Sequence, residues 1–541
     1  MEDVVSTSSQ VIPGSAERLS GLAIRVRSEA PSLRECSTAV VSAALLIFAF
    51  PDFNLWPLAW ISLVPLSLVV ARRAQPWRCF LLGWLFGTVF FYGSCYWLTF
   101  SMIHFGGIPT LLAFVMLLPG AVLLGIFPAV FALGLALTIR KWGTAALLLA
   151  PVFWCALEWG RLEITGQLWN AIGYSQAYHP RLIQSASWGG VYAVGFLIVS
   201  VNAAVACAVL ERSRRALAIA ASVITLSAAL IFLANRTSPF RQWSMRNEAE
   251  TTVVAIQPNV PMEIVKSAEQ MRQLTRRHFE MSESALRQLP DDRRPRLVIW
   301  PESPMNFAYG GDSQLREMIA TFAKANNTSV LLNSQEVAPN DGIYNSAVLI
   351  NQEGGLVAQY DKIRLLPFGE YVPLPQWLPG AGLIRAIVGN FTPGTNYGLM
   401  PVGTVQAGVF ICIESAYPSI ARKFTGEGAD VLINISNDGY LGPTAVMRQH
   451  LANAVFRAVE NGRPLLRVTN TGITALITPA GEVRDATRGF EPDLRIWTIA
   501  RHASAPTFYA AHGDLFAGGC SLASLLIFAF SFKRNGIKAH S

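Results

Sequence analysis

The sequence is short of charge. Only 14% of its 541 residues are Asp, Glu, Lys or Arg, while 52% are hydrophobic. A soluble globular chain usually carries about a quarter charged residues, so a fully soluble protein is excluded. The charges that exist lie mostly between positions 245 and 505, whereas residues 37–235 form long apolar runs. This asymmetry predicts a membrane part followed by a soluble part.

Motifs for cofactors are also lacking. The seven cysteines form no CxxC pair, which argues against a zinc site and a disulfide framework. No other metal-binding motif and no nucleotide-binding motif occurs, so no metal or other cofactor is expected. Six cysteines lie in or beside apolar runs, where a small buried side chain is the ordinary role. Cys412 is the single cysteine between 245 and 505, and it is either buried filler or a nucleophile.

Eight apolar runs approach the ~20 residues that a helix needs to cross a bilayer. Seven precede the soluble part and one follows it, at roughly 36–50, 55–71, 79–100, 109–138, 143–160, 187–210, 216–234 and 514–532. The first two runs are short, so a tight membrane hairpin and a re-entrant pair both stay open. The fourth is long enough to tilt, or to kink at Pro119 or Pro128.

The distribution of basic residues argues against nucleic-acid binding despite a net charge of +8, because no basic stripe with interleaved aromatics occurs. Basic residues instead cluster after every second apolar run, as is typical of cytoplasmic loops. The clusters are Arg72, Arg73 and Arg78, then Arg140 and Lys141, then Arg212, Arg214 and Arg215, and last Lys533, Arg534 and Lys538. This alternation predicts that both termini are cytoplasmic and that the soluble part is extracytoplasmic.

These patterns predict five parts of the chain. Residues 1–35 and 533–541 are expected to be cytoplasmic tails, 36–236 a seven-helix membrane domain, 245–505 a catalytic domain and 512–532 a final transmembrane helix. Aromatic side chains near the outer helix ends are expected to anchor the protein at the membrane interface. They are Phe53, Trp56, His104, Phe105, Trp169 and Tyr174.

The soluble part reads as alternating strands and helices, which predicts an α/β sheet with covered faces. Apolar β-branched runs predict strands at 252–256, 297–300, 329–332, 405–412 and 431–435. Amphipathic stretches predict helices at 268–289, 313–325 and 445–461. The ends of such strands are where α/β sheets usually place their ligands.

Three residues at the ends of such elements could carry chemistry. Glu302 follows a buried strand in a Trp-Pro-Glu-Ser turn, and its alternative role is a solvated turn carboxylate. Lys362 precedes a constrained Pro-Phe-Gly turn that Glu370 follows, and its alternative is a solubilising charge. Cys412 stands where an apolar strand stops, and a sharp turn into a helix would place its sulfur near amides that favour thiolate. Its alternative is a buried strand cysteine.

Together the three residues match one chemistry, although their spacing does not prove that they meet. A thiol needs a base to become a nucleophile at neutral pH, and the carboxylate of Glu302 can serve. Acyl transfer from a thiolate builds negative charge on the carbonyl oxygen, which a fixed cation such as Lys362 can stabilise.

In this order Glu302, Lys362 and Cys412 resemble the Glu-Lys-Cys triad of the carbon–nitrogen hydrolase (nitrilase) superfamily. Further motifs resemble its membrane-embedded branch, the bacterial apolipoprotein N-acyltransferases. They are 255–261, 300–303, 367–373, 437–442, 449–451, Arg463 and 469–472. The resemblance implies a polytopic helical domain of about eight transmembrane helices and a nitrilase-like αββα sandwich. It also implies the bacterial inner membrane, with the catalytic domain on the periplasmic side.

The resemblance further implies a two-step acyl transfer. Cys412 would take an acyl chain from a phospholipid, typically phosphatidylethanolamine, as a thioester. It would then pass the chain to the α-amino group of the diacylglyceryl-modified N-terminal cysteine of an apolipoprotein. Glu302 would be the base, Lys362 would support the tetrahedral intermediates, and Glu370 and Glu414 would assist. The partners expected are these two substrates and the membrane lipids, with the protein a monomer.

Three departures from the family pattern fall at substrate-facing positions and bear on acyl-chain preference. Ile413 follows the nucleophile where the family often has Tyr. Tyr440 and Leu441 replace the more usual Trp-Phe pair. The chain after Pro261 lacks the Trp often found there.

Other classes of protein fit less well. A membrane-tethered amidase or nitrilase shares the first half-reaction and differs only in delivering the acyl group to water. A lipid-binding scaffold that has lost activity conflicts with an intact Glu302, Lys362 and Cys412. A transporter usually carries charges inside its helices, and few occur here, Glu158 and Arg161 being the nearest.

Overall fold

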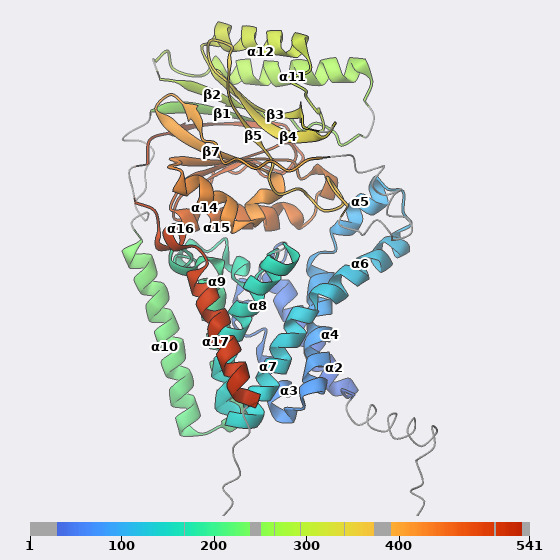
Figure 1. Cartoon of the computed structure of the whole chain (residues 1–541), viewed down its shortest axis with the longest axis vertical. Coiled ribbons are helices and arrows are strands. Elements are labelled where there is room, and N and C mark those ends of the chain that lie inside the picture. Colours follow the sequence, from blue (N-terminus) through green and yellow to red (C-terminus); the bar gives the residue numbers. More distant parts are fainter. Residues whose placement is uncertain are drawn as a thin grey trace, which may run out of the picture.

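The computed structural model describes residues 30–166, 168–238, 250–263, 266–292, 294–339, 341–372, 391–502 and 505–532. A bundle of helices stands beneath a two-sheet sandwich, and the last helix returns from the sandwich along the bundle (Figure 1). The expected tails at 1–35 and 533–541 lie outside the described residues, except for 30–35.

The helices of the bundle follow the apolar runs closely. They are α2 (Leu33–Ala49), α3 (Val64–Arg73), α4 (Pro76–Ser94), α5 (Leu98–His104), α6 (Thr110–Leu124), α7 (Ile126–Trp142), α8 (Ala150–Thr165), α9 (Ala186–Glu211), α10 (Arg214–Thr237) and α17 (Leu515–Phe532). Among the described residues, four helical stretches are long and apolar enough to span a membrane, or five if the bent pair α4–α5 counts as one span. The chain is thus a multi-pass membrane protein with four or five candidate spans by length and composition among the described residues.

The long run at 109–138, for which the sequence left open a tilt or a kink at Pro119 or Pro128, lies within one helical stretch, Thr110–Trp142. It divides at Gly125 into α6 and α7. A Cβ at Gly125 would lie 2.7 Å from the Thr88 hydroxyl on α4, so the missing side chain lets the two segments approach α4 closely. The short run at 55–71 forms a 3-10 turn, Trp56–Trp60, followed by the ten residues of α3.

The soluble part is a sandwich of two six-stranded sheets, in the orders β12-β1-β2-β3-β4-β5 and β11-β10-β9-β8-β7-β6. The strands are β1 (Thr251–Gln257), β2 (Arg296–Ile299), β3 (Ser329–Val337), β4 (Ile343–Ile350), β5 (Leu356–Asp361), β6 (Met400–Val402), β7 (Val405–Ile411), β8 (Val431–Ser436), β9 (Leu465–Thr469), β10 (Ala475–Ile477), β11 (Val483–Arg484) and β12 (Asp493–Ile499). The parallel inner strands β1, β7 and β8 are buried almost throughout, which explains why they read as continuous apolar runs.

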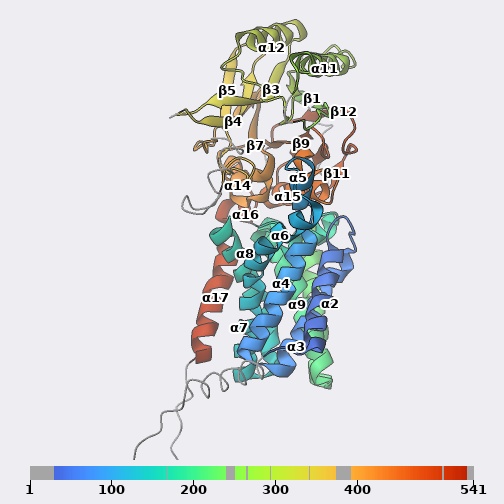
Figure 2. The same ribbon diagram turned by 90° about the vertical axis from the view of Figure 1, so that its right-hand side faces the viewer.

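Helices cover both outer faces of the sandwich. The first sheet carries α11 (Ala268–Leu286) and α12 (Ser313–Asn326), and the second carries α14 (Pro418–Gly426) and α15 (Val446–Asn461) (Figure 1). The αββα layering expected from the sequence is confirmed. The layer of α14 and α15 faces the membrane bundle, and α5 reaches up beside the sandwich (Figure 2).

The contact between α15 and the bundle contains a buried ion pair. Arg457 and Glu460 are both fully buried and lie 2.7 Å apart. Glu460 also accepts a hydrogen bond from the backbone N–H of Val191 in α9 at 2.9 Å, and Arg457 donates to the hydroxyl of Tyr174 at 3.3 Å. Tyr174 and Trp169 are buried in this contact, so the expectation that they anchor the protein in the membrane interface is wrong. The chain between α8 and α9 folds under α15 and removes both from lipid.

We expect Arg457→Met to lower the free energy of unfolding by about 3–5 kcal/mol, because it leaves the Glu460 carboxyl buried without its cation. Burial raises the pKa of Glu460 to about 7 even with Arg457 acting in the opposite direction. Thermal unfolding of the detergent-solubilised protein measures the loss. Combining Arg457→Met with Glu460→Leu is expected to recover most of it, because no buried charge remains. A single variant as stable as wild type would contradict the assignment.

Candidate active site

Cys412 occupies the sharp turn that the sequence predicts. It follows β7 directly and is the first residue of a 3-10 helix, Cys412–Ala416. Its φ of +51° lies in the left-handed region, which is disfavoured for a residue with a side chain. Such strain clusters at functional sites, where the surrounding structure holds the residue in place.

An acid and lysine cluster lies at the ends of strands from the first sheet. Glu302 follows β2, Lys362 follows β5, and Glu370 comes from the loop after it. The Lys362 ammonium lies 2.8 Å from Oε1 of Glu370 and 3.7 Å from Oε1 of Glu302. The Asn345 amide, on β4, donates to both carboxylates, at 2.9 Å to Glu302 and 2.7 Å to Glu370. One lysine and one amide therefore hold two carboxylates in fixed positions.

The thiol of Cys412 meets this cluster across the sandwich. The Glu302 carboxylate and the Lys362 ammonium are both close enough to the thiol to influence its ionisation. The structure thus brings together the three residues that the sequence singled out, from β2, β5 and β7. A base beside the thiol and a cation beside both are the parts that acyl transfer needs.

The electrostatics of the site keep Cys412 protonated at rest. Burial raises the pKa of its thiol, the Glu302 carboxylate raises it further, and Lys362 only partly opposes them. The helix-terminal amides that the sequence predicts to favour a thiolate belong here to a 3-10 turn of only five residues, and burial of the thiol acts against them. Such a thiol becomes a nucleophile only when a base removes its proton.

The pKa values of Lys362 and Glu302 are both raised, for different reasons. Burial alone would lower the pKa of Lys362, but the carboxylates of Glu370 and Glu302 raise it above its ordinary value, so it stays cationic. Burial raises the pKa of Glu302, Lys362 opposes that rise, and Glu370 adds to it, leaving the pKa above its ordinary value. A carboxylate with a raised pKa is a stronger base for a thiol proton.

Glu414 joins the two halves of the site. One carboxylate oxygen accepts hydrogen bonds from the backbone N–H groups of Ile363 and Arg364, at 2.8 and 3.0 Å. The other accepts from the N–H of Ile411, at 2.8 Å. The fully buried side chain thus ties the Lys362 loop to the nucleophile turn without touching Lys362 itself.

The two remaining predicted site residues, Ile413 and Tyr440, differ in exposure. Ile413 is buried behind the nucleophile, whereas the Tyr440 side chain is 52% exposed. The Tyr440 backbone oxygen accepts a hydrogen bond from the Ser101 hydroxyl of α5 at 2.6 Å, and its ring packs edge-on against Phe105 at 5.5 Å. The rim of the site is therefore built partly from the membrane part of the chain.

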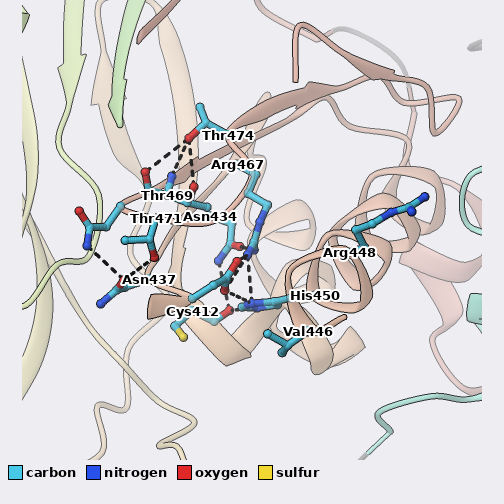
Figure 3. A network of polar contacts seen from close by, with 12 residues as sticks. Cys412, Asn434, Asn437, Val446, Arg448, His450, Arg467, Thr469, Thr471 and Thr474 are labelled. Carbon is cyan, nitrogen blue, oxygen red and sulfur yellow. Dashed lines mark hydrogen bonds and ion pairs between the residues drawn. The ribbon is translucent and has the colours of Figure 1, made fainter. Parts of the chain in front are cut away.

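Further buried polar residues lie near Cys412, and no role was predicted for them from the sequence. Asp438 and His450 fall in the motifs 437–442 and 449–451, whereas Asn345, Asn434 and Arg467 were not predicted at all. Figure 3 shows Asn434, His450 and Arg467 beside Cys412. The available signal was a polar residue inside an otherwise apolar strand, as with Asn434 in β8 and Arg467 in β9. Within the described part of the chain, no group of three or more His, Cys, Asp or Glu side chains is arranged to hold a metal ion.

Comparison with known proteins places this geometry in a family. Residues 42–204 match the model of the apolipoprotein N-acyltransferase N-terminal domain, and residues 252–507 match that of the carbon–nitrogen hydrolases. The apolipoprotein N-acyltransferase of Geobacter metallireducens is 31% identical over 517 residues, which cover 93% of this chain and 96% of that protein. The enzyme of the same name from Pseudomonas putida is 31% identical over 458 residues, covering 82% and 86%.

Among solved structures, Nit3 of Saccharomyces cerevisiae, a nitrilase-superfamily member, matches with a TM-score of 0.38 and 17% identity, over 48% of this chain and 92% of that chain. The two domain models together account for the membrane bundle and the sandwich in their observed order. With the identity to full-length relatives, they show that the chain belongs to the apolipoprotein N-acyltransferases.

Proposed function

We propose that this enzyme moves an acyl chain from a phospholipid to a lipoprotein through a thioester on Cys412. The donor proposed is phosphatidylethanolamine, and the acceptor is the α-amino group of the diacylglyceryl-modified N-terminal cysteine of an apolipoprotein. The observation that carries the proposal is the meeting of the half-buried Cys412 thiol with Glu302 and Lys362, in a domain that stands on membrane helices.

In the first half-reaction Glu302 takes the proton of the Cys412 thiol, and the thiolate attacks the carbonyl carbon of the donor's ester. The carbonyl oxygen becomes an oxyanion beside the ammonium of Lys362, which stabilises the tetrahedral intermediate. When the intermediate collapses, the C–O bond breaks and the lysophospholipid leaves with the proton held by Glu302. Cys412 retains the acyl chain as a thioester.

In the second half-reaction the neutral amine of the acceptor attacks the thioester carbonyl. Lys362 again stabilises the oxyanion, and Glu302 takes a proton from the attacking nitrogen. Collapse breaks the C–S bond, forms the amide, and returns the proton to the Cys412 sulfur. Glu370 and Glu414 support both steps by holding the cluster and the two loops in place, while Ile413 and Tyr440 border the acyl chain.

We further propose eight membrane passes, seven in a membrane domain of residues 36–236 and one in a final helix at 512–532. The catalytic domain between them comprises residues 245–505. The support is the direction of the helices, since α3, α7 and α9 end far from the sandwich (Figure 1). The basic residues Arg72 and Arg73 lie in the last turn of α3, and Arg140 and Lys141 lie in that of α7. Basic helix ends away from the sandwich favour a cytoplasmic location for that end of the bundle and a periplasmic one for the catalytic domain.

A reporter fused after Arg241 tests this placement. We expect alkaline phosphatase to be active there and a cytoplasm-dependent fluorescent protein to be dark. Fusions after Arg212 serve as the matched control and should give the reverse pattern. Cytoplasmic activity after Arg241 would overturn the count of eight passes.

Transfer itself is tested with acyl-labelled phosphatidylethanolamine and a synthetic peptide that begins with diacylglyceryl-cysteine. We expect the label to appear as an amide on the peptide's α-nitrogen, and a peptide acetylated at that nitrogen should receive none. Release of the label as free fatty acid in the presence of the free amine would contradict transfer and indicate a hydrolase of the amidase type.

A further inference from the structure

A buried hydrogen-bonded group lies beside the nucleophile, on strands of the second sheet and the helix that covers it. It consists of Asn434 on β8, Asp438 beyond the end of β8, His450 on α15 and Arg467 on β9, and Figure 3 shows Arg467 reaching the His450 ring beside Cys412. None of these four side chains is hydrogen-bonded or ion-paired to the Cys412 thiol, and none takes part in the catalytic steps. Two of them, His450 and Asn434, contact the backbone carbonyl of Cys412 instead, and the other two hold those side chains in place.

The contacts of His450 show that its Nε2 carries a proton. Nε2 lies 3.0 Å from the carbonyl oxygen of Cys412, which can only accept, so Nε2 must donate. Nδ1 lies 2.8 Å from Oδ1 of Asp438 and 3.0 Å from Nη2 of Arg467. Arg467 also donates to both Asp438 oxygens, at 3.2 and 3.0 Å. Asp438 and Arg467 therefore fix the orientation of the ring that donates to Cys412.

The Cys412 carbonyl has a second donor. The amide of Asn434 lies 3.3 Å from it and 3.3 Å from the carbonyl of Phe410, and Asn434 is itself held by Arg467 at 2.6 Å. Two donors thus hold the oxygen of a residue whose φ is +51°. A strained backbone persists only where its surroundings over-determine it, and these two bonds supply that constraint at the nucleophile.

The residue next to His450 is clamped by the membrane part of the chain. The Gln449 oxygen accepts from the indole N–H groups of Trp97 and Trp169, at 3.0 and 2.9 Å. Its amide nitrogen donates to the carbonyls of Pro51 and Ser94, at 3.0 and 3.1 Å. All four bonds join α15 to the upper end of the membrane bundle. The Trp169 ring also packs against the His450 ring, with centroids 5.6 Å apart.

We propose that His450 is a positioning residue for the nucleophile, and that the membrane domain sets its place through Gln449. By this account the bundle is more than a tether, because it fixes the helix whose histidine holds the Cys412 turn against Glu302. The proposal rests on the proposed role of Cys412 as the acyl carrier. It concerns where the sulfur points, and it adds no group to the chemical steps.

Two substitutions at one position separate positioning from simple packing. His450→Gln places an amide N–H near the position of Nε2 and can still donate to the Cys412 carbonyl, whereas the shorter amide of His450→Asn reaches only the position of Nδ1. We expect His450→Asn to lower the rate constant for thioester formation by about 100-fold, the effect of a small misplacement of a reacting group. His450→Gln should recover most of that rate, and the KM for the phospholipid should not change in either variant.

The rate at which iodoacetamide alkylates Cys412, followed on the peptide that contains it, gives a second readout that needs no lipid. We expect the order wild type, His450→Gln, Gln449→Ala and His450→Asn, from fastest to slowest. The exposed His512→Gln serves as the matched control and should react like wild type. Thermal unfolding of each variant shows whether it is folded.

Equal rates in folded His450→Gln and His450→Asn would overturn the positioning role, as would a loss confined to KM. Wild-type reactivity in Gln449→Ala would overturn the contribution of the membrane domain. Failure of wild type to form any thioester, with the alkylation order intact, would instead count against the proposed role of Cys412 and leave the positioning role supported.

Discussion

Replacing Lys362 by Met should lower the rate constant for thioester formation by about 1,000-fold, the loss expected when a main oxyanion donor is removed. The ammonium is fully buried between two carboxylates, so no water can replace it at low cost. The substitution acts in a second way as well. Without the lysine, Glu302 and Glu370 form a buried pair of like charges, and one of them takes up a proton. Oxyanion support and part of the base are lost together.

The measurement is a single-turnover assay with excess enzyme, in which acyl-labelled phospholipid is the only substrate. Lys324→Met, which removes an exposed lysine on α12, is the matched control and should leave the rate unchanged. A Lys362→Met enzyme that keeps more than a tenth of the wild-type rate would contradict the role assigned to the ammonium.

Glu302→Gln should lower the same rate constant by about 100- to 10,000-fold, the range for loss of a general base. The isosteric amide keeps the volume of the side chain and still faces Asn345 and Lys362, but it cannot take the thiol proton. Glu317→Gln, on the exposed side of α12, is the matched control. Equal rates in Glu302→Gln and wild type would mean that another group activates Cys412.

The same residue sets the pH dependence of the wild-type enzyme. Glu302 must be ionised to act as a base, so the rate should fall as the pH drops through its pKa. Burial raises that pKa and Glu370 adds to the rise, although Lys362 opposes it, so the fall should come at a higher pH than an ordinary glutamate gives. The profile of Glu302→Gln should lack this limb. A wild-type rate that stays flat down to the ordinary pKa of glutamate would contradict the raised value.

Much of the fold could be predicted because a buried strand or membrane helix appears in the sequence as a run of apolar residues. Strands β1, β7 and β8 are buried on both faces and read as apolar runs, and all three were located from the sequence. Strand β5 was missed because it is largely exposed, and β11 because it has only two residues. The membrane helices follow their apolar runs, but α2 and α3, with 17 and 10 residues, are too short to count as spans by length.

The individual residues of the site could be predicted, but the fact that they lie together could not. Glu302, Lys362 and Cys412 each stand at the end of a recognisable strand or motif. Their meeting depends on two sheets packing face to face, since β2 and β5 belong to one sheet and β7 to the other. No local pattern encodes that contact. The same holds for Asn434 and Arg467, which become neighbours only through the register of β8 and β9.

The interface between bundle and sandwich was beyond prediction for a related reason. Trp169 was expected to face the membrane interface, because aromatic residues at helix ends usually do. It is instead turned inward to Gln449 and His450, whose sequence gives no sign of a membrane contact.

The most direct test of the account is mass spectrometry of the Cys412 peptide after the purified enzyme has been exposed to phosphatidylethanolamine without an acceptor. We predict a fatty acyl adduct on Cys412 that neutral hydroxylamine removes, that an added diacylglyceryl-cysteinyl peptide discharges, and that is absent from Cys412→Ala. An acyl adduct that persists in Cys412→Ala, or a wild-type enzyme that acylates the peptide while Cys412 is never modified, would contradict it.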